Sequence, residues 1–241
     1  LEFRRVLFRS LAKPEAEDES VHAFSQLARQ LGLWLNIGSL ALKGAVDKLL
    51  NRSLLIGPDG AIAARYDKIH LFDVDLPGRT ESYRESAGTV PGTEVVVARL
   101  AGLTLGLTVC YDLRFPELFR RLGAAGAQLV VVPAAFTVPT GEAHWDVLLR
   151  ARAIENLCGI VAAAQWGRHA NGRATYGHSL IVDCWGEVLA RLPSGEGIVD
   201  LGRARAASAA HQRRAAGHGC PRPRFRRGAA ALTAVRTRAT P

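Results

Sequence analysis

The hydrophobic positions in the first part of the chain follow two rhythms, one typical of a helix and one typical of strands. Residues 17–32 carry apolar side chains at helical spacing, open on acidic residues and close on a glycine, which predicts a helix. Residues 33–42 predict a buried strand, and residues 51–66 predict two strands around a Pro-Asp-Gly turn. Residues 68–78 leave this predicted sheet and begin a long loop that runs to about residue 93.

The rest of the chain alternates short apolar strands with helices. The predicted elements are a hairpin over 94–110, a helix over 115–127, a strand over 128–136, a helix over 144–158, a strand over 159–166 and a hairpin over 178–192. Several of these strands lack a polar face, as strands covered by helices do. The pattern therefore predicts an α/β fold whose sheet is covered by helices.

Composition narrows the class of protein further. The chain has 241 residues, of which 48% are hydrophobic and 22% are charged, a balance typical of globular domains. It contains no run of eighteen consecutive apolar residues, so we expect no membrane partner. Four cysteines in a chain of this length do not form a disulfide scaffold, which favours free thiols and a cytoplasmic location.

The positive charge is confined to the two ends of the chain. The formal net charge is +9, yet residues 202–241 hold ten arginines and no acidic residue, and residues 1–10 hold three arginines and one glutamate. The body between them carries 18 basic and 21 acidic groups, which argues against nucleic acid as a partner. The alternative is a basic nucleic-acid-binding arm at the C-terminus, but its single aromatic residue, Phe225, does not make a stacking platform.

These compositional shifts predict three parts. We expect residues 1–10 to be a non-native leader, because the chain has no initiator methionine, and residues 11–201 to be the folded domain. Residues 202–241 are rich in Arg and Ala and poor in large apolar side chains, so we expect a disordered or out-of-frame tail.

One cysteine stands where chemistry is expected. Cys110 ends an apolar strand-like run and precedes a predicted helix, so its side chain would lie at a strand-to-helix elbow. The positive end of a helix favours the thiolate, which is the nucleophilic form. The alternative interpretation is a small buried core thiol, which we expect for Cys158 and Cys184.

Lys68 ends a predicted strand beside apolar residues and would provide a fixed cation for a developing oxyanion, or else be an ordinary surface lysine. Glu85 and Glu117 are candidate acid or base groups, or solvated carboxylates, and His70 is a candidate structural histidine. The chain has no Walker loop, no dinucleotide-binding glycine motif and no His or Cys at metal-ligand spacing. We therefore expect no metal and no cofactor.

Five segments together resemble the nitrilase, or carbon–nitrogen hydrolase, superfamily, over about residues 20–201. They are YDKIHLFDVDLPG, RESAGTVPGTE, GLTVCYDLRFPELFRRL, TGEAHWDVLLRARAIEN and AAAQWGRHANGRATYGHSLIVDCWGEVLA. The last two are most similar to the branch of deaminated glutathione amidases, and less close to ω-amidases and N-carbamoyl amidohydrolases. The resemblance implies a four-layer α-β-β-α sandwich, a homodimer formed through sheet-flanking helices, and no cofactor.

The superfamily's Glu-Lys-Cys triad implies roles for matching residues. Cys110 would attack the amide carbon, Lys68 and the backbone N–H of Tyr111 would hold the oxyanion, and Glu85 would be a second, supporting glutamate. The resulting thioester would be hydrolysed by water after ammonia leaves. His70, Arg114 and Glu117 look structural in this family. On the substrate side we expect Arg173 to pair with a carboxylate, with a surface ion pair as its alternative, and expect three further pocket residues, Thr140, His144 and Trp166.

The chain departs from the superfamily pattern at both ends. The triad glutamate normally follows an early strand in a Pro-Glu motif, and counting that far back from Lys68 reaches the first residues or runs off the chain. Glu15 follows a proline but is also explained as a carboxylate at a helix N-terminus, and Glu2 fits no better. We therefore expect a domain that lacks the first strand-helix unit, ends its match near Leu201 and turns over weakly, or serves as an inactive binding or dimer partner.

Overall fold

The computed structural model describes residues 11–45, 48–75, 82–100, 102–169, 172–200 and 233–235 of the chain. The chain divides into two compact units, Leu1–Val96 and Val97–Pro241. The leader predicted over residues 1–10 lies outside the described residues. So does the tail predicted over residues 202–241, apart from a short strand at Thr233–Val235.

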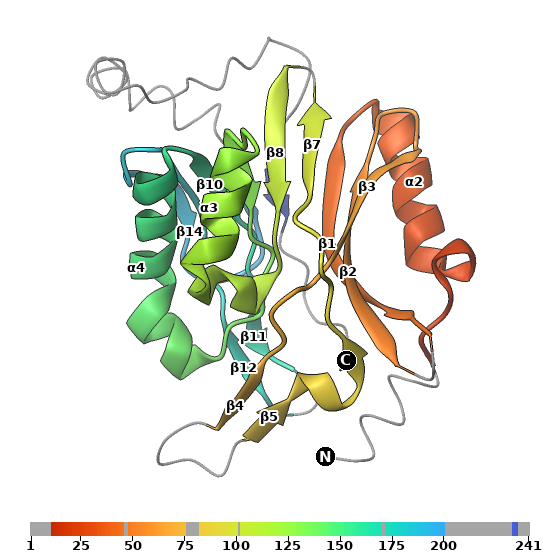
Figure 1. The fold of residues 1–241 in the computed structure, drawn as a ribbon, viewed down its shortest axis with the longest axis horizontal. Helices are drawn as coiled ribbons and strands as arrows, with labels where there is room; N and C mark the ends of the chain where they lie inside the picture. The colour runs from red at the N-terminus through yellow and green to blue at the C-terminus, as the bar shows by residue number, and fades with distance from the viewer. Residues whose placement is uncertain are drawn as a thin grey trace. The chain divides into compact units, whose positions relative to one another are not determined.

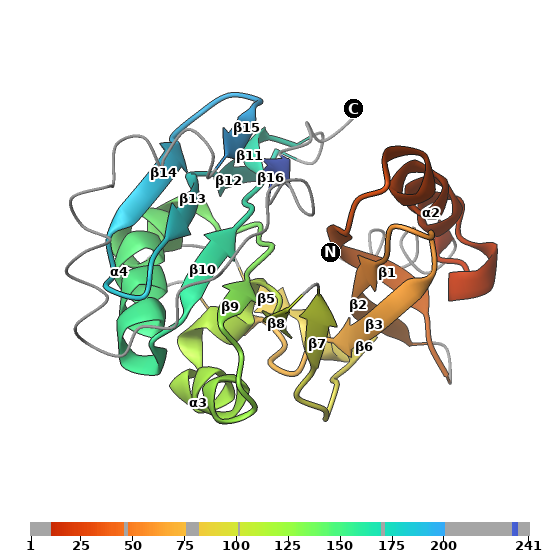
Figure 2. The same ribbon diagram turned by 90° about the horizontal axis from the view of Figure 1, so that it is seen from above.

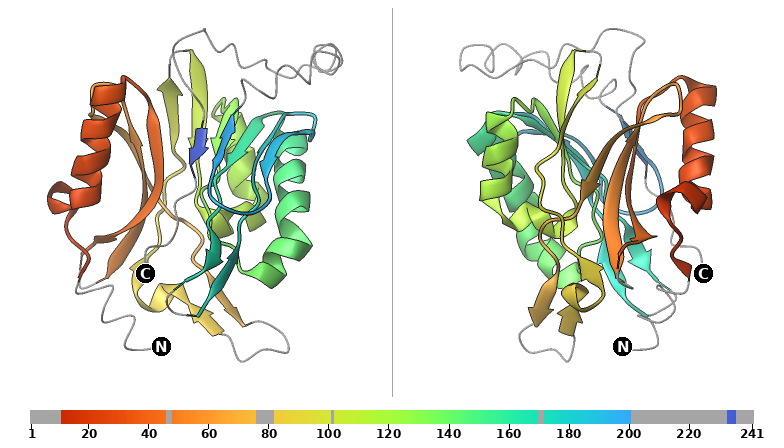
Figure 3. Two further views of the ribbon diagram at one scale, coloured as in Figure 1. Left: turned by 180° about the vertical axis from the view of Figure 1, so that it is seen from behind. Right: turned by 45° about the vertical axis from the view of Figure 1, so that its right-hand side comes forward.

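The first unit is a helix on a sheet. Its helices are η1 (Glu15–Glu17), α2 (Glu19–Leu31) and η2 (Glu85–Ala87), and its sheet consists of β1 (Leu35–Lys43), β2 (Leu49–Ile56), β3 (Ile62–Asp67) and β6 (Thr89–Val90). The strand order is β1-β2-β3, all antiparallel, with β6 pairing in parallel with the start of β2. Helix α2 covers one face of this sheet (Figures 1 and 3).

The ends of α2 explain why the sequence pattern predicted it well. The Asp18 carboxylate accepts hydrogen bonds from the backbone N–H groups of Ser20 and Val21, which satisfies two donors of the first turn. Gly32 adopts a left-handed conformation at φ 63°, where a side chain would be strained, and so ends the helix. The predicted helix, the strand after it and the hairpin around the Pro-Asp-Gly turn are confirmed, but the expectation that the strand is buried is wrong, because Leu42 alone of the nine residues of β1 is buried.

The long loop predicted from residue 68 to about residue 93 is wrong in part. Three short strands and a 3-10 helix interrupt it, including β4 (Asp73–Asp75) and β5 (Ser82–Arg84), which pair antiparallel. Elements of two or three residues are too short to show a periodicity, so the hydrophobic pattern carries no signal for them.

The second unit is a mixed six-stranded sheet with two helices. Its strands are β7 (Val97–Leu100), β8 (Leu103–Leu107), β9 (Leu129–Val131), β10 (Gly159–Ala162), β13 (Ser179–Val182) and β14 (Val188–Leu192). The order across the sheet is β14-β13-β10-β9-β8-β7, and β8, β9 and β10 run parallel. The connections between successive parallel strands contain α3 (Pro116–Ala124) and α4 (Val138–Asn156), which lie on the same face of the sheet, as Figure 2 shows.

Two further pairs of strands complete this unit. Strands β11 (Trp166–Arg168) and β12 (Ala174–Tyr176) pair antiparallel, as do β15 (Ile198–Asp200) and β16 (Thr233–Val235). Helix α4 begins six residues before its predicted start at residue 144, because Thr137 precedes it in an extended conformation and a proline stands in its first turn. The α/β fold class is confirmed, and each unit has its helices on a sheet.

The cysteines are mostly as expected. Cys158 and Cys184 are buried in the core, as predicted. Cys110 and Cys158 are free thiols, but Cys184 is disulfide-bonded, so the prediction of free thiols is wrong at that position. Cys220 lies outside the described residues. In the described part of the chain, no helix is long and apolar enough to cross a membrane.

Candidate active site

Lys68 lies directly after β3 and is buried. Its backbone N–H donates to the Asn51 carbonyl on β2, with N and O 2.9 Å apart, and its carbonyl accepts from Gly92 N at 2.9 Å. The side chain is only 4% exposed, so the alternative of a surface lysine is wrong. An ammonium group in such surroundings needs a close counter-charge, because burying an unpaired charge is costly.

Glu85, the first residue of η2, provides that counter-charge. Its Oε2 accepts from Lys68 Nζ at 2.5 Å and from the backbone N–H of Phe72 at 2.7 Å. Its Oε1 accepts from Asn51 Nδ2 at 2.8 Å. The structure therefore brings together two of the predicted residues, Lys68 and Glu85, and adds Asn51, which sequence analysis missed.

Gly92 allows the segment after β6 to approach the end of β3. A Cβ atom at position 92 would lie 2.1 Å from the carbonyl oxygen of Asp67, a distance that no side chain tolerates. The second glycine of the RESAGTVPGTE segment is thus explained by backbone packing beside Lys68. Gly92 N donates to the Lys68 carbonyl and the Asn51 carbonyl accepts from the Lys68 N–H, so both segments bind the backbone of the lysine.

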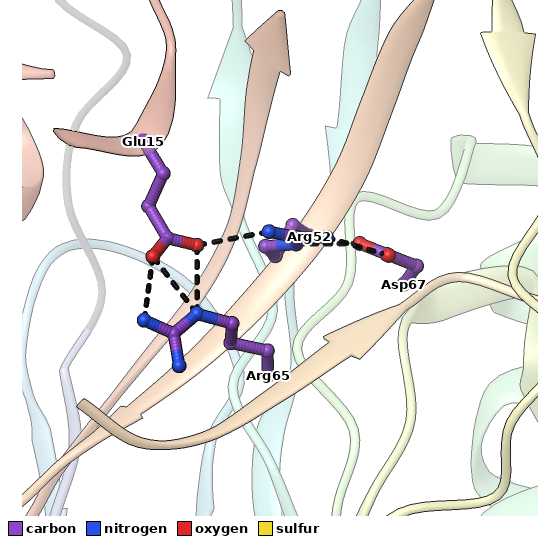
Figure 4. A network of polar contacts seen from close by, with 4 residues as sticks. All are labelled: Glu15, Arg52, Arg65 and Asp67. Atoms are coloured by element: carbon purple, nitrogen blue, oxygen red, sulfur yellow. Dashed lines mark hydrogen bonds and ion pairs between the residues drawn. The ribbon is translucent and has the colours of Figure 1, made fainter. Parts of the chain in front are cut away.

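Glu15 belongs to a network of ion pairs on the first unit's sheet, which Figure 4 shows. Its carboxylate pairs with Arg65 at 2.8 Å and with Arg52 Nη1 at 3.0 Å, and Arg52 in turn binds Asp67 through two hydrogen bonds of 2.7 and 2.8 Å. Burial alone would raise the pKa of Glu15, but the hydrogen bonds from Arg65 and Arg52 outweigh it and lower the pKa.

This arrangement argues against Glu15 as a general base. Both of its oxygens are engaged by guanidinium groups, and a lowered pKa makes a carboxylate a weaker proton acceptor. The helix-terminus interpretation is closer to the structure, since Glu15 opens η1, but two arginines rather than the short helix hold its charge. Glu2 lies outside the described residues.

In the second unit, Cys110 lies in a tight turn that we call the Cys110 elbow (residues 108–115). Its backbone is left-handed, with φ 51°, and its N–H donates to the Pro133 carbonyl at 2.8 Å. The buried Asp112 accepts from the Val109 N–H at 2.8 Å and so closes the turn. A left-handed non-glycine residue is strained and persists only where its surroundings fix it, a feature common at functional sites.

The environment of Cys110 differs from that of the other free thiol. Cys110 is partly exposed, whereas Cys158 is buried, and burial raises the pKa of the Cys158 thiol to about 12. The prediction that Cys110 borders the following helix needs correction. Cys110 is the first residue of the five-residue helix η3 (Cys110–Arg114), and α3 begins only at Pro116.

Arg114, at the end of η3, contacts residues of the elbow and of α4. Its Nη2 lies 3.3 Å from His144 Nδ1, and its guanidinium lies 5.8 Å from the Tyr111 ring centre and 5.5 Å from the Phe136 ring centre. Burial lowers the pKa of Arg114, against the raising effect of Tyr111 and Cys110. Two predicted substrate-binding residues, Tyr111 and His144, thus meet at an arginine that the resemblance marked as structural.

The remaining predicted residues lie farther along the second unit. Thr140 is in the first turn of α4, where its hydroxyl lies 2.7 Å from that of Thr137. Arg173 donates from Nη2 to the Ala135 carbonyl at 2.9 Å. Trp166 begins β11 and is exposed. Among the described residues, no group of three His, Cys, Asp or Glu side chains is placed to hold a metal ion.

Lys68 and Glu85 belong to the first unit, and Cys110, Arg114 and His144 belong to the second. Each unit contains one of two different candidate reactive groups. The first has a buried ammonium held by a carboxylate, and the second has a partly exposed thiol on a strained turn.

Comparison with known proteins identifies relatives over most of the chain. The family model "Carbon-nitrogen hydrolase" matches residues 5–210. The deaminated glutathione amidase of Yersinia enterocolitica is 51% identical over 170 residues, which are 70% of this chain and 59% of that protein. The enzyme of the same name from Homo sapiens is 49% identical over 181 residues, or 73% and 55%. The chain thus spans less than two thirds of the length of these two relatives.

Comparison with solved structures identifies the same kind of relative. The Caenorhabditis elegans NitFhit protein superposes with a TM-score of 0.68 and 41% identity, covering 83% of this chain and 50% of that one. Saccharomyces cerevisiae Nit3, a nitrilase-superfamily member, gives a TM-score of 0.72 at 28% identity, covering 92% and 78%. A mutant amidase from Nesterenkonia sp. AN1, with acrylamide added at its active site cysteine, gives 0.67 at 30%, covering 78% and 70%.

Proposed function

The chain belongs to the carbon–nitrogen hydrolase family, and from this we propose that it is an amidase for a small, carboxylate-bearing linear amide of the deaminated glutathione kind. The observation that carries the proposal is the Cys110 elbow, where a partly exposed free thiol lies on a strained turn. We place the catalytic domain at residues 11–201, within the segment that the family model matches.

In the proposed reaction the Cys110 thiolate attacks the amide carbon, and the carbonyl π electrons move to oxygen. Lys68 Nζ and the Tyr111 N–H donate hydrogen bonds to that oxyanion, each typically contributing about 3 kcal/mol to the stability of the transition state. The C–N bond then breaks as a proton reaches the nitrogen. Ammonia departs, and the acyl group remains bound to Cys110 as a thioester. Water attacks the thioester carbon, which releases the carboxylic acid and returns the thiol.

Glu85 serves this reaction by holding Lys68, since both of its oxygens already accept hydrogen bonds from the protein. In the family pattern an upstream glutamate provides the proton for the leaving ammonia, and Glu15 is unsuited to that role because two arginines bind it. A chain in which no carboxylate fills this role would turn over weakly. General acid–base catalysis typically contributes about 10²–10⁴-fold to rate.

Substrate selection is assigned to the second unit. Arg173 pairs with the substrate carboxylate, and Thr140, His144 and Trp166 line the pocket. The contact between Arg114 and His144 supports this assignment, because a half-buried guanidinium beside a pocket residue adds positive charge where an anionic substrate binds. ω-Amidase and N-carbamoyl amidohydrolase activities are the alternatives, and they differ in the amide that is cleaved.

An ammonia-release assay tests the proposal. Deaminated glutathione, α-ketoglutaramate and an N-carbamoyl amino acid are compared, and we expect the first to be cleaved fastest. Cys110→Ala should abolish release and remove the acyl-enzyme seen by intact-protein mass spectrometry, whereas Cys158→Ala should retain both. Ammonia release that survives Cys110→Ala would refute the thioester mechanism.

We also propose a cytoplasmic homodimer that binds neither nucleic acid nor membrane. The exposed apolar side chains of Val147, Ile154 and Leu157 on and beside α4 support a second copy as partner, because an isolated chain leaves them in water. Sedimentation of the wild type and of Val147→Glu tests the dimer, which the charge should weaken.

Salt-sensitive RNA binding that disappears on deleting residues 202–241 would contradict the absence of a nucleic-acid partner. Cell fractionation, with reduction of the Cys184 disulfide scored in each fraction, tests the location.

A further inference from the structure

We propose that Asn51 is a positioning residue, which fixes the Glu85 carboxylate and through it the Lys68 ammonium. The inference rests on the proposed function, because it assigns Lys68 the task of meeting the oxyanion. Asn51 touches neither substrate nor sulfur in this role. Its contribution is to set the direction in which the lysine presents its N–H groups.

The β-sheet register places Asn51 beside both members of the ion pair. Arg52 pairs with Asp67 across β2 and β3, so Asn51 faces Lys68 at the next step of the ladder. The Asn51 carbonyl accepts the backbone N–H of Lys68 at 2.9 Å, and its side-chain Nδ2 donates to Glu85 Oε1 at 2.8 Å. One residue therefore holds the lysine by its backbone and the glutamate by its side chain.

The hydrogen bond from Asn51 to Glu85 matters because the two oxygens of Glu85 accept from different donors. Oε2 accepts from Lys68 Nζ and from the Phe72 N–H, which leaves Oε1 to Asn51. The terminal torsion of a glutamate is broad, so two donors on one oxygen do not stop the carboxylate from rotating. A third donor, on the other oxygen, fixes the rotation of the carboxylate. A carboxylate accepts only, so the amide nitrogen of Asn51 must be the atom that faces it.

The strand pairing at this point has other support. Arg52 binds Asp67 with two hydrogen bonds, and Glu15 binds Arg52 from the other side (Figure 4). The Asn51 side chain is therefore not needed to hold β2 against β3. Its bond to Glu85 serves the ion pair rather than the sheet.

Asn36 on β1 is a matched control. It is a half-buried asparagine of the same sheet, and its Nδ2 donates to Ser53 Oγ at 3.1 Å and to the Leu54 carbonyl at 3.3 Å. Both of these acceptors belong to β2, and neither is Lys68 or Glu85. Asn36→Ala therefore removes comparable hydrogen bonds from the sheet while leaving the ion pair intact.

The test is the rate at which trace acetic anhydride acetylates Lys68, measured by peptide mass spectrometry against the exposed Lys43 of the same molecule. A hydrogen bond to a charged group is worth enough that Asn51→Ala should raise the labelling of Lys68 about tenfold. Asn36→Ala should leave it unchanged. This readout needs no turnover, so it decides the inference even if the wild type proves inactive and the proposed function fails.

A charge exchange provides the rescue. Asn51→Asp sets a second carboxylate against Glu85, and Lys68 labelling should rise further than in Asn51→Ala. Adding Glu85→Gln to Asn51→Asp restores an amide–carboxylate hydrogen bond in the reverse direction, with the amide oxygen still open to Lys68 and Phe72. Labelling of the double variant should fall well below that of Asn51→Asp, and this comparison remains available if Asn51→Ala does not fold.

Where amide hydrolysis is measurable, Asn51→Ala should lower kcat about tenfold with little change in KM, because the oxyanion contact is made only in the transition state. Asn36→Ala should lower neither. Folded Asn51 variants that label Lys68 at the wild-type rate, or a double variant without rescue, would overturn the inference.

Discussion

Arg152 of α4 reaches the backbone of the Cys110 elbow, where its Nε donates to the Leu113 carbonyl at 3.0 Å. The guanidinium is buried, and its Nη1 pairs with Glu155 at 3.0 Å. It also lies 5.5 Å from the ring centre of Phe119 on α3. A single side chain from the RARAIEN segment thus connects both helices of the second unit to the turn that carries the thiol.

Replacing Arg152 should therefore damage both stability and the elbow. Arg152→Ala leaves the Leu113 carbonyl and Glu155 without this donor, and breaking a buried ion pair typically costs about 3 kcal/mol. We expect a loss of this size in the free energy of unfolding, measured by urea denaturation. We also expect a changed rate of Cys110 alkylation in the folded protein.

Arg150 is the matched control, since it lies on the same helix and donates to the Gly186 carbonyl at 2.7 Å, away from the elbow. Arg150→Ala should cost less stability and leave Cys110 alkylation at the wild-type rate. Equal effects of the two substitutions on alkylation would contradict the role given to Arg152.

The network around Glu15 predicts a pH-dependent contribution to stability. Burial raises the pKa of Glu15, but the hydrogen bonds of Arg65 and Arg52 lower it below its ordinary value of 4.5. The unfolded state then binds more protons, so the stabilisation is complete above pH 4.5 and is lost as the pH falls through the lowered folded value. Glu15→Gln should destabilise by about 1 kcal/mol at pH 7, and by progressively less in acid.

Urea unfolding at a series of pH values measures this difference. Glu19→Gln is the control, because Glu19 is exposed and pairs with the exposed Lys13, and its effect should be smaller. A Glu15→Gln penalty that grows toward acid pH would show that the network does not hold the carboxylate ionised.

The sequence predicted the elements whose periodicity extends over several turns or strand residues. The helix α2 and the hairpin β2–β3 were found because capping residues and a turn motif mark their ends. The strands β4, β5 and β6 were missed, since two or three residues show no period. The start of α4 was placed late because Thr137 and the proline after it lie in a stretch without helical spacing.

Those parts of the candidate site were predictable in which a single residue type, such as a cysteine or a lysine, indicates the chemistry by itself. Cys110 and Lys68 were named from their positions at strand ends, and the buried pairing of Lys68 with Glu85 agrees with that choice. Asn51 needed the observed register of β2 against β3, because the pairing shifts by one residue between Leu55 and Ile56, and counting outward from the Pro-Asp-Gly turn would set position 51 opposite position 67 instead of 68. The bond from Arg152 to the elbow joins segments 39 residues apart, and no local pattern encodes it.

Gly92 should be irreplaceable although its backbone is not left-handed. A methyl group at this position would lie 2.1 Å from the Asp67 carbonyl oxygen, so the segment must move away from Lys68. We expect Gly92→Ala to lower the free energy of unfolding by about 2–3 kcal/mol, as overpacking does, and to raise the labelling of Lys68 by acetic anhydride.

The same segment offers its own control in Gly88, where an added Cβ would meet no atom within 4 Å. Gly88→Ala should be close to neutral in thermal unfolding. If the two alanine variants melted at the same temperature, the close approach at Asp67 would not be what fixes the segment.

The two free thiols of the described residues should react at very different rates with iodoacetamide. Cys110 is partly exposed, whereas burial raises the pKa of Cys158 to about 12, so at pH 8 almost no thiolate forms there. We expect peptide mapping of the native protein to find the label on Cys110, and Cys110→Ala to remove it. Cys158→Ala should leave the labelling rate unchanged while lowering stability, because Cys158 fills a core position. Preferential labelling of Cys158 in the folded protein would mean that Cys110 is not the accessible nucleophile.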